Sequence, residues 1–324
     1  MSVKDITQTD TEKSGLLPGL HDSAFVSEYG RIETIRAARY NTSFSLVLVD
    51  MSGAAGAFKL TASAVLETVR SCDVVGMTED GSLAMVLPET DYFGSLVTIR
   101  KLARAVGLAF PNRSMPDVII SQATFPKDGR LYAELLSNAG KNAAAKRDSI
   151  WARLELKKKI FWEVIGELAS GAFKETENAS FDAGTGQVLT EFFMDQINEL
   201  ILKEIARNPH KRGIMYLAAR KVASTMPAAK LLNSTAAFTS KVFLVGEADE
   251  SAWDIKNATP IVIDDPRFRE IFFTFYLSED SAYALVCKEN WGGIYSCFHT
   301  SDTTLVEGLI AKFQTEYSLQ EQLG

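Results

Sequence analysis

The stretch RSCDVVGMTEDGSLAMVLP, residues 70–88, decides the fold of the first half of the chain. Two short apolar runs, 74–77 and 83–87, flank the turn-forming residues TEDG, and this pattern predicts a β-hairpin. Hydrophobic periodicity predicts the elements around it. Together these elements predict an α/β sandwich with a central mixed sheet over residues 14–150. The helices are expected at 22–40, 57–70, 92–107 and 131–147, and the further strands at 43–51 and 117–126.

The remainder of the chain predicts a second α/β domain over residues 171–324. A helix at 189–207 precedes five apolar runs, which predict a mainly antiparallel sheet. A closing helix follows, with Ser301 or Asp302 as its N-cap. Between the two halves, residues 151–170 predict one amphipathic connector helix. Its apolar stripe serves either core packing or a parallel dimer contact.

The composition limits the classes of function. Of 324 residues, 46% are hydrophobic and 23% charged, as in an ordinary soluble globular protein. The formal net charge of −7 argues against DNA or an anionic membrane as the main partner. Three cysteines without a CxxC pair and three scattered histidines disfavour a zinc site. Residues 1–13 are polar, which predicts a disordered N-terminus and no signal peptide, so a cytoplasmic protein with reduced thiols is expected.

Four local motifs of the first half resemble, in the same order, the GGDEF family of diguanylate cyclases. GLLPGLHDSAF (15–25) is similar to the entry motif DxLTGLxNRxxF, and FSLVLVDMSG (44–53) to the strand that ends in a metal-binding Asp. SLAMVLPETD (82–91) is similar to the strand after the signature, and ATFPKDG (123–129) to a later strand and turn. The resemblance implies the GGDEF fold. Cyclases of that family condense two GTP into cyclic di-GMP, with Mg²⁺ ions held by carboxylates to offset the charge of the triphosphate.

The catalytic signature of that family is replaced in this chain. Two acids stand where paired glycines let the backbone pass close to the nucleotide, and a glycine and a serine stand where acids hold the metal. Of the family's DxDxFK pattern only Asp50 is kept. Ala55 takes the place of the phosphate-binding lysine, and Phe58 that of the guanine-binding asparagine. The resemblance therefore implies no metal, no cofactor and no cyclase activity. The degenerate signature consists of Glu79, Asp80, Gly81, Ser82 and Leu83.

Upstream of the signature, the family's RxxD inhibitory site is retained as Arg70-Ser-Cys-Asp73. An Arg fork can donate to guanine O6 and N7 or to a phosphate, and a carboxylate can accept from guanine N–H groups. The alternative is that Arg70 and Asp73 form a solvated ion pair worth less than about 1 kcal/mol. The resemblance implies further basic contacts from the next helix. These are Arg100, Lys101 and Arg104.

The second half resembles the DICT domain, a sensory module found beside GGDEF domains. The resemblance rests on FLVGEADESAW (243–253) and FHTSDTTLVEGLIAKF (298–313), where Ser301 is an insertion relative to the family's pattern. It implies a sensing role or a protein partner bound through this domain, and the partner's identity is left open.

The leading hypothesis is a non-catalytic cyclic di-GMP receptor in bacterial signalling, which binds the dinucleotide at the RxxD motif. The family also binds an intercalated dinucleotide that bridges two domains, so a homodimer is implied. The alternative is a nucleotide-free scaffold that uses the degenerate GGDEF fold for protein contacts. A GTP sensor without turnover is disfavoured by Ala55 and Phe58.

Overall fold

The computed structural model describes residues 17–110, 117–170, 183–290 and 293–319. The chain divides into two compact units, Met1–Asp148 and Ser149–Gly324. The N-terminus expected to be disordered, 1–13, lies outside the described residues. In the described part of the chain no helix is both long and apolar enough to cross a bilayer.

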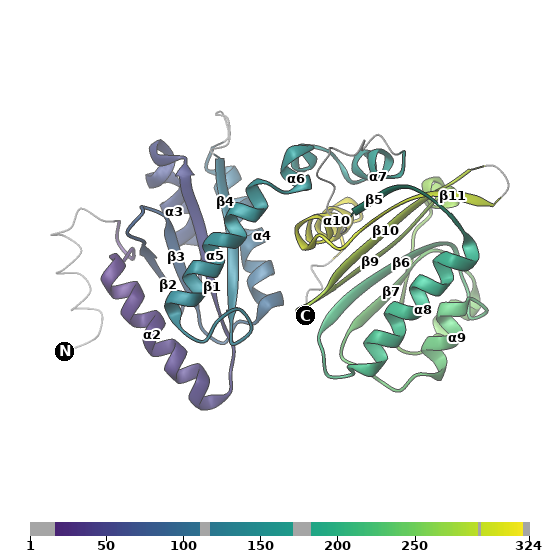
Figure 1. The fold of residues 1–324 in the computed structure, drawn as a ribbon, viewed down its shortest axis with the longest axis horizontal. Helices are drawn as coiled ribbons and strands as arrows, with labels where there is room; N and C mark the ends of the chain where they lie inside the picture. The colour runs from purple at the N-terminus through teal and green to yellow at the C-terminus, as the bar shows by residue number, and fades with distance from the viewer. Residues whose placement is uncertain (1–16, 111–116, 171–182, 291–292, 320–324) are drawn as a thin grey trace. The chain divides into compact units, whose positions relative to one another are not determined.

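The first unit is a four-stranded sheet with helices on both faces (Figure 1). Helices α3 and α4 cover one apolar face of the sheet, and α2 and α5 cover the other. The strand order is β2-β3-β1-β4, which places β1 in the interior, where its first six residues are buried. The elements are α2 (Ser23–Tyr40), β1 (Phe44–Gly53), α3 (Phe58–Thr68), β2 (Val74–Met77), β3 (Leu83–Leu87), α4 (Tyr92–Leu108), β4 (Asp117–Phe125) and α5 (Tyr132–Arg147).

The α/β class expected from the sequence is confirmed, but the pairing in the first sheet differs from the mixed pairing we expected. All three pairs among its named strands are antiparallel. The reason is the β2–β3 hairpin, because its tight turn places β3 beside β2, and β3 then pairs with β1. The strands β1 and β2 run in the same direction but are not neighbours.

The second unit is built on a seven-stranded sheet with helices on both faces (Figure 1). The strand order is β5-β11-β10-β9-β6-β7-β8. The pairs from β5 to β6 are antiparallel, as expected, and the pairs β6–β7 and β7–β8 are parallel. The elements are α6 (Ile150–Arg153), α7 (Phe161–Ala169), β5 (Ala183–Thr190), α8 (Glu191–Arg207), β6 (Gly213–Val222), α9 (Pro227–Ser234), β7 (Lys241–Ala248), β8 (Thr259–Val262), β9 (Ile271–Ser278), β10 (Ala282–Glu289), β11 (Ile294–Thr300) and α10 (Thr303–Glu316).

The two faces of the second sheet carry different cores. On one face, α8 and α9 pack on aliphatic strand residues such as Met215 and Leu244. On the other face, rings from α7 and α10 meet rings from the strands. Phe161 of α7 and Phe313 of α10 both contact Phe273 of β9, with ring centroids 5.7 and 5.2 Å apart. Side-chain alternation along each strand therefore places the packed Phe161, Phe273 and Phe313 rings on the face opposite α8 and α9.

The prediction of one connector helix over residues 151–170 is wrong. The segment forms α6, a 3-10 turn at Leu156–Lys158 and then α7. Glu155 has φ +51, a left-handed conformation that stops the first helix. The apolar residues of α7 bury within the second unit, where Val164 and Leu168 are almost fully inaccessible. Of the two uses considered for the stripe, the structure shows core packing.

The expectation of reduced thiols is also wrong for one pair of cysteines. Cys287 of β10 and Cys297 of β11 lie opposite each other in antiparallel register, with Cα atoms 4.1 Å apart, and form a disulfide. Their separation in sequence is 10 residues, and only the pairing of two strands brings them together. Cys72 is free and exposed.

Candidate functional site

The segment Glu79–Leu83, which the sequence predicts to be a degenerate signature, includes a closed turn held by its own side chains. Thr78 N donates to the carbonyl of Ser82 at 2.8 Å, and Gly81 takes φ +84, which glycine adopts without steric cost. The Asp80 carboxylate accepts from the Thr78 hydroxyl and from the Ser82 N–H. Ser82 is buried, and Glu79 points out into solvent. The turn thus uses one of its two exposed acids, Asp80, for local hydrogen bonds, as Asx turns do.

Asp50, which the sequence resemblance matches to a metal-binding acid, is paired within the chain. Arg147, the last residue of α5, places Nη2 2.8 Å from Asp50 Oδ2 and 3.0 Å from Ser52 Oγ. The Ser52 N–H donates to Asp50 Oδ1 at 2.9 Å. Burial by itself would raise the pKa of Asp50, but the hydrogen bonds from Ser52 and Arg147 outweigh it and lower the pKa. A guanidinium therefore supplies the positive charge at this carboxylate.

The donor set around Asp50 does not fit a Mg²⁺ ion. Mg²⁺ is usually bound through one or two carboxylates that are free to coordinate. Here the Asp50 carboxylate is engaged by Arg147, and the positions that the sequence resemblance matches to further acids are Gly81 and Ser82. Across the described residues no three His, Cys, Asp or Glu side chains are grouped so that they could hold a metal ion. We derive no metal-dependent step for this chain.

The RxxD residues form a compact turn directly after α3. The Arg70 N–H donates to Asp73 Oδ2 at 2.8 Å, and the Asp73 N–H donates to the Arg70 carbonyl at 3.0 Å. The side chains differ in exposure, because that of Arg70 is 56% exposed and that of Asp73 only 1%. Arg70 Nη2 also donates to Thr90 Oγ1 at 3.2 Å. The Asp73 carboxylate thus holds the backbone of Arg70 and also forms an ion pair with its guanidinium, with Oδ2 3.8 Å from Nε, while the Arg70 side chain stays more than half exposed.

The three basic residues expected from the following helix all lie on α4. Asp91 caps this helix by accepting from the Gly94 N–H at 2.9 Å, so the Arg70 guanidinium at Thr90 lies beside the start of α4. At about 1.5 Å per residue, the expected basic residues lie about 12 to 18 Å farther along α4. Arg100 is partly buried, and the other two, Lys101 and Arg104, are exposed.

Arg147 was missed by the sequence reasoning, and no local signal identifies it. It lies 97 residues after Asp50, at a helix end where a basic residue is ordinary. The burial of Asp73 was missed for the same reason, since a four-residue pattern does not show which way a carboxylate turns. Phe58 lies against the core beneath α3 and α4, where it packs as an apolar residue.

The first unit is an α/β sandwich that has an antiparallel sheet and a closed turn between β2 and β3. No family model matches the chain, and no curated protein matches its sequence. Solved structures that are similar to it include the GGDEF domain of YfiN from Pseudomonas aeruginosa, with 18% identity over 41% of this chain and 94% of that one, at a TM-score of 0.36.

Two further solved structures are similar to this chain. The diguanylate cyclase SiaD from Pseudomonas aeruginosa, in complex with its activator SiaC, has 18% identity over 45% of this chain and 63% of that one, at a TM-score of 0.37. The coiled coil and GGDEF domain of DgcB from Caulobacter crescentus, in complex with c-di-GMP, has 12% identity over 45% of this chain and 86% of that one, at 0.36. At these identities and TM-scores the likenesses establish neither the family nor the function.

Proposed function

We propose that this chain is a non-catalytic cyclic di-GMP receptor, in which a degenerate GGDEF domain binds the dinucleotide at Arg70. The observation that carries the proposal is the contrast between two neighbouring turns. The signature turn is closed by Asp80 and Ser82, and Asp50 is neutralised by Arg147. The Arg70 guanidinium, in contrast, makes a long ion pair, with Nε 3.8 Å from Asp73 Oδ2, and its side chain is 56% exposed.

The geometry of the turn supports different roles for the two RxxD residues in this proposal. Arg70 makes the ligand contact, because its fork can donate to guanine O6 and N7 or to a phosphate. Asp73 positions Arg70 through the 2.8 Å bond from the Arg70 N–H. A direct contact between Asp73 and guanine requires its buried carboxylate to leave the turn. Lys101 and Arg104 supply exposed positive charge for a ligand that extends along α4.

Isothermal titration of the full chain with cyclic di-GMP tests the proposal. A bidentate Arg–guanine contact contributes about 1–3 kcal/mol, so Arg70→Ala is expected to weaken binding by about tenfold to a hundredfold. Asp73→Asn is expected to weaken it less, because the amide oxygen can still accept from the Arg70 N–H.

Arg31→Ala is the matched control for the titration. Arg31 is 58% exposed and pairs with Glu28 on α2, on the other face of the sheet, so binding should be unchanged. The absence of heat with the native chain, or equal binding by the Arg70 and Arg31 variants, contradicts the receptor proposal. Formation of cyclic di-GMP from GTP and Mg²⁺ contradicts its non-catalytic part.

A nucleotide-free scaffold is the second candidate, and the surface of α2 favours it. Phe25, Ile32 and Ile35 are 46%, 50% and 57% exposed at spacings that place them along one side of the helix. An apolar stripe of this kind suits a protein partner or a second copy of the chain. Light scattering across a range of concentrations, with native chain and Ile32→Glu/Ile35→Glu, separates the candidates. A nucleotide-independent dimer lost in the variant supports the scaffold.

A further inference from the structure

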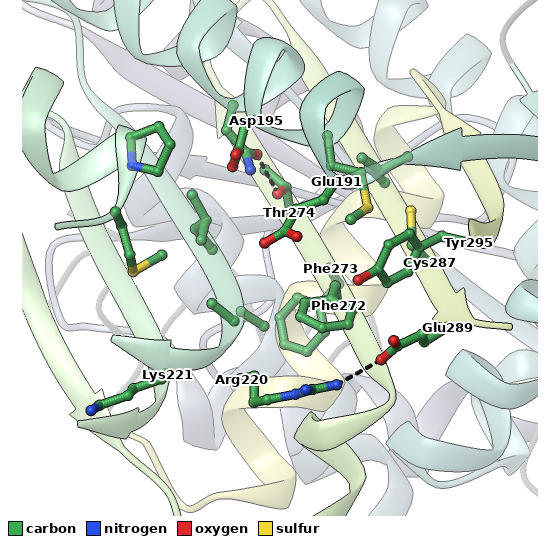
Figure 2. A pocket seen from close by; sticks show the side chains of 18 of the residues that line it. Glu191, Asp195, Arg220, Lys221, Phe272, Phe273, Thr274, Cys287, Glu289 and Tyr295 are labelled. Carbon is green, nitrogen blue, oxygen red and sulfur yellow. Dashed lines mark hydrogen bonds and ion pairs between the residues drawn. The ribbon is translucent and has the colours of Figure 1, made fainter. Parts of the chain in front are cut away.

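A cavity of about 400 Å³ lies in the second unit between α8 and the sheet (Figure 2). Its volume is in the range of small-molecule sites. Side chains from α8 form one wall, and strands β6, β9, β10 and β11 form the floor. The disulfide cysteine Cys287 and the rings of Phe272 and Tyr295 lie in this floor, with the two ring centroids 5.2 Å apart.

A β-bulge in β6 shapes the rim of the cavity. Ala218 pairs with Val245 and Lys221 with Glu247, so β6 advances three residues while β7 advances two. In a regular strand alternate residues face opposite sides, but here the consecutive residues 217–221 all line the cavity. The bulge places Arg220 and Lys221 at the cavity rim, as bulges beside functional sites commonly do.

Some charged side chains of the cavity form ion pairs and others do not. Arg220 Nη2 lies 2.6 Å from Glu289 Oε2, and Lys221 Nζ lies 3.2 Å from the carboxylate of Asp249. Glu191 and Asp195 on α8 also line the cavity, and neither has an ion pair among the described residues. These two acids are four residues apart, so they share one side of the helix. Figure 2 shows them at the end of the cavity away from the Arg220–Glu289 pair.

The surroundings of Asp195 oppose its negative charge. Burial is the main cause that raises its pKa, and the neighbouring carboxylates of Glu191 and Glu199 raise it further. A cation placed between Glu191 and Asp195 would relieve this repulsion. The negative charge of Asp195 is therefore unfavourable at this wall of the cavity, and a positively charged ligand would stabilise it.

Asn198 adds a buried polar group one turn farther along α8. It is 8% exposed and lines the cavity. Its Oδ1 accepts from the Thr274 hydroxyl at 2.6 Å, which fixes the orientation of the amide. Its Nδ2 has no hydrogen-bond partner in the part of the chain that the structure describes. This donor on the cavity wall is therefore available to a ligand that carries a hydrogen-bond acceptor.

We propose that this cavity binds a small organic cation, an amine with an aromatic ring and a hydrogen-bond acceptor. The ammonium group lies between Glu191 and Asp195, and the ring packs against Phe272 and Tyr295, which offer apolar area and aromatic contacts. The acceptor takes the Asn198 Nδ2 proton. This site belongs to the second unit and does not depend on whether Arg70 binds a dinucleotide.

Ligand-observed NMR and calorimetry on the full chain test the proposal with three matched probes. The amine is 2-amino-1-phenylethanol, the neutral analogue is 1-phenyl-1,2-ethanediol, and the anion is 3-hydroxy-3-phenylpropanoate. The amine should bind at least about tenfold more tightly than the diol, and the anion should bind least. No saturation transfer to the amine at about 10 mM, or an anion that binds as tightly, overturns the proposal.

The variant Glu191→Gln/Asp195→Asn removes both charges and keeps the side-chain shapes. It should weaken amine binding by at least about tenfold and leave diol binding unchanged. Glu204→Gln is the control, because Glu204 lies on α8 outside the cavity lining. If the double variant binds the amine as tightly as the control does, the assignment of the ammonium site is wrong. Urea denaturation of both variants confirms that each is folded.

Discussion

Asp265 holds together one corner of the second unit, and its replacement by Asn should destabilise that unit in a pH-dependent way. Its carboxylate accepts from Arg267 Nη2 at 2.6 Å, from Arg267 Nε at 2.9 Å and from the Tyr317 hydroxyl at 2.7 Å. Tyr317 also accepts from the Trp162 indole N–H at 2.8 Å, so the network joins α7 to the end of α10. An amide can accept with only one of its two polar atoms.

The size of the effect follows from the pKa of Asp265. The hydrogen bonds from Arg267, and then from Tyr317, lower it from 3.8 to about 2 despite partial burial. Each pKa unit corresponds to about 1.4 kcal/mol, which gives about 2 kcal/mol in favour of the folded state at pH 7. Because the folded-state pKa is depressed, this stability is present above pH 4 and is lost as the pH falls toward 2. About half should remain at pH 3.

Tryptophan fluorescence is a selective assay for this effect. All four tryptophans, Trp151, Trp162, Trp253 and Trp291, belong to the second unit, so fluorescence-detected urea unfolding reports on that unit alone. Asp265→Asn should lower the free energy of unfolding by about 2 kcal/mol at pH 7 and by about half as much at pH 3.

Asp254→Asn is the control for the fluorescence assay, since Asp254 is exposed and lies outside the network. It should change the free energy of unfolding by no more than about 0.5 kcal/mol. If Asp265→Asn is equally mild at pH 7, or if its cost is the same at pH 7 and pH 3, the network does not contribute as argued.

Two further substitutions test other parts of the structure. Gly246→Ala should destabilise the second unit by at least about 2 kcal/mol in the same fluorescence assay, because Gly246 has φ +150 and a Cβ there would lie 2.1 Å from the Ala219 carbonyl oxygen. Preserved stability would mean that the bulge beside it relaxes. Arg147→Met should raise the pKa of Asp50, because burial then acts with less opposition. Carboxyl-detected NMR titration measures this pKa, and an unchanged value contradicts the pairing with Arg147.

The RxxD motif predicted the position of two residues of the candidate site but not the direction of their side chains. The RxxD spacing identified Arg70 and Asp73 as neighbours on one turn, and the structure places them there. The spacing did not show that the Asp73 carboxylate is turned inward, since its direction depends on packing around the turn. The ligand role of Arg70 is still a proposal, and its geometry now makes Asp73→Asn a milder variant than the motif alone implies.

The sequence by itself determined the features that depend on neighbouring residues. Apolar runs predicted β1 and β3, turn residues predicted the hairpin, and polar residues before helices predicted the caps. Asp22 accepts from the Phe25 N–H at 2.8 Å, and Asp302 from the Leu305 N–H at 2.7 Å. Such hydrogen bonds close within three residues, so local order is sufficient to identify them.

Only the tertiary structure decided the features that join distant segments. The Asp50–Arg147 pair spans 97 residues, and Asn198 meets Thr274 across 76. The disulfide, the antiparallel first sheet and the broken connector likewise depend on which strands and helices pack together. Sequence patterns report the period and polarity of one segment, whereas these contacts depend on sheet order and register. The cavity beneath α8 therefore has no counterpart in any local motif.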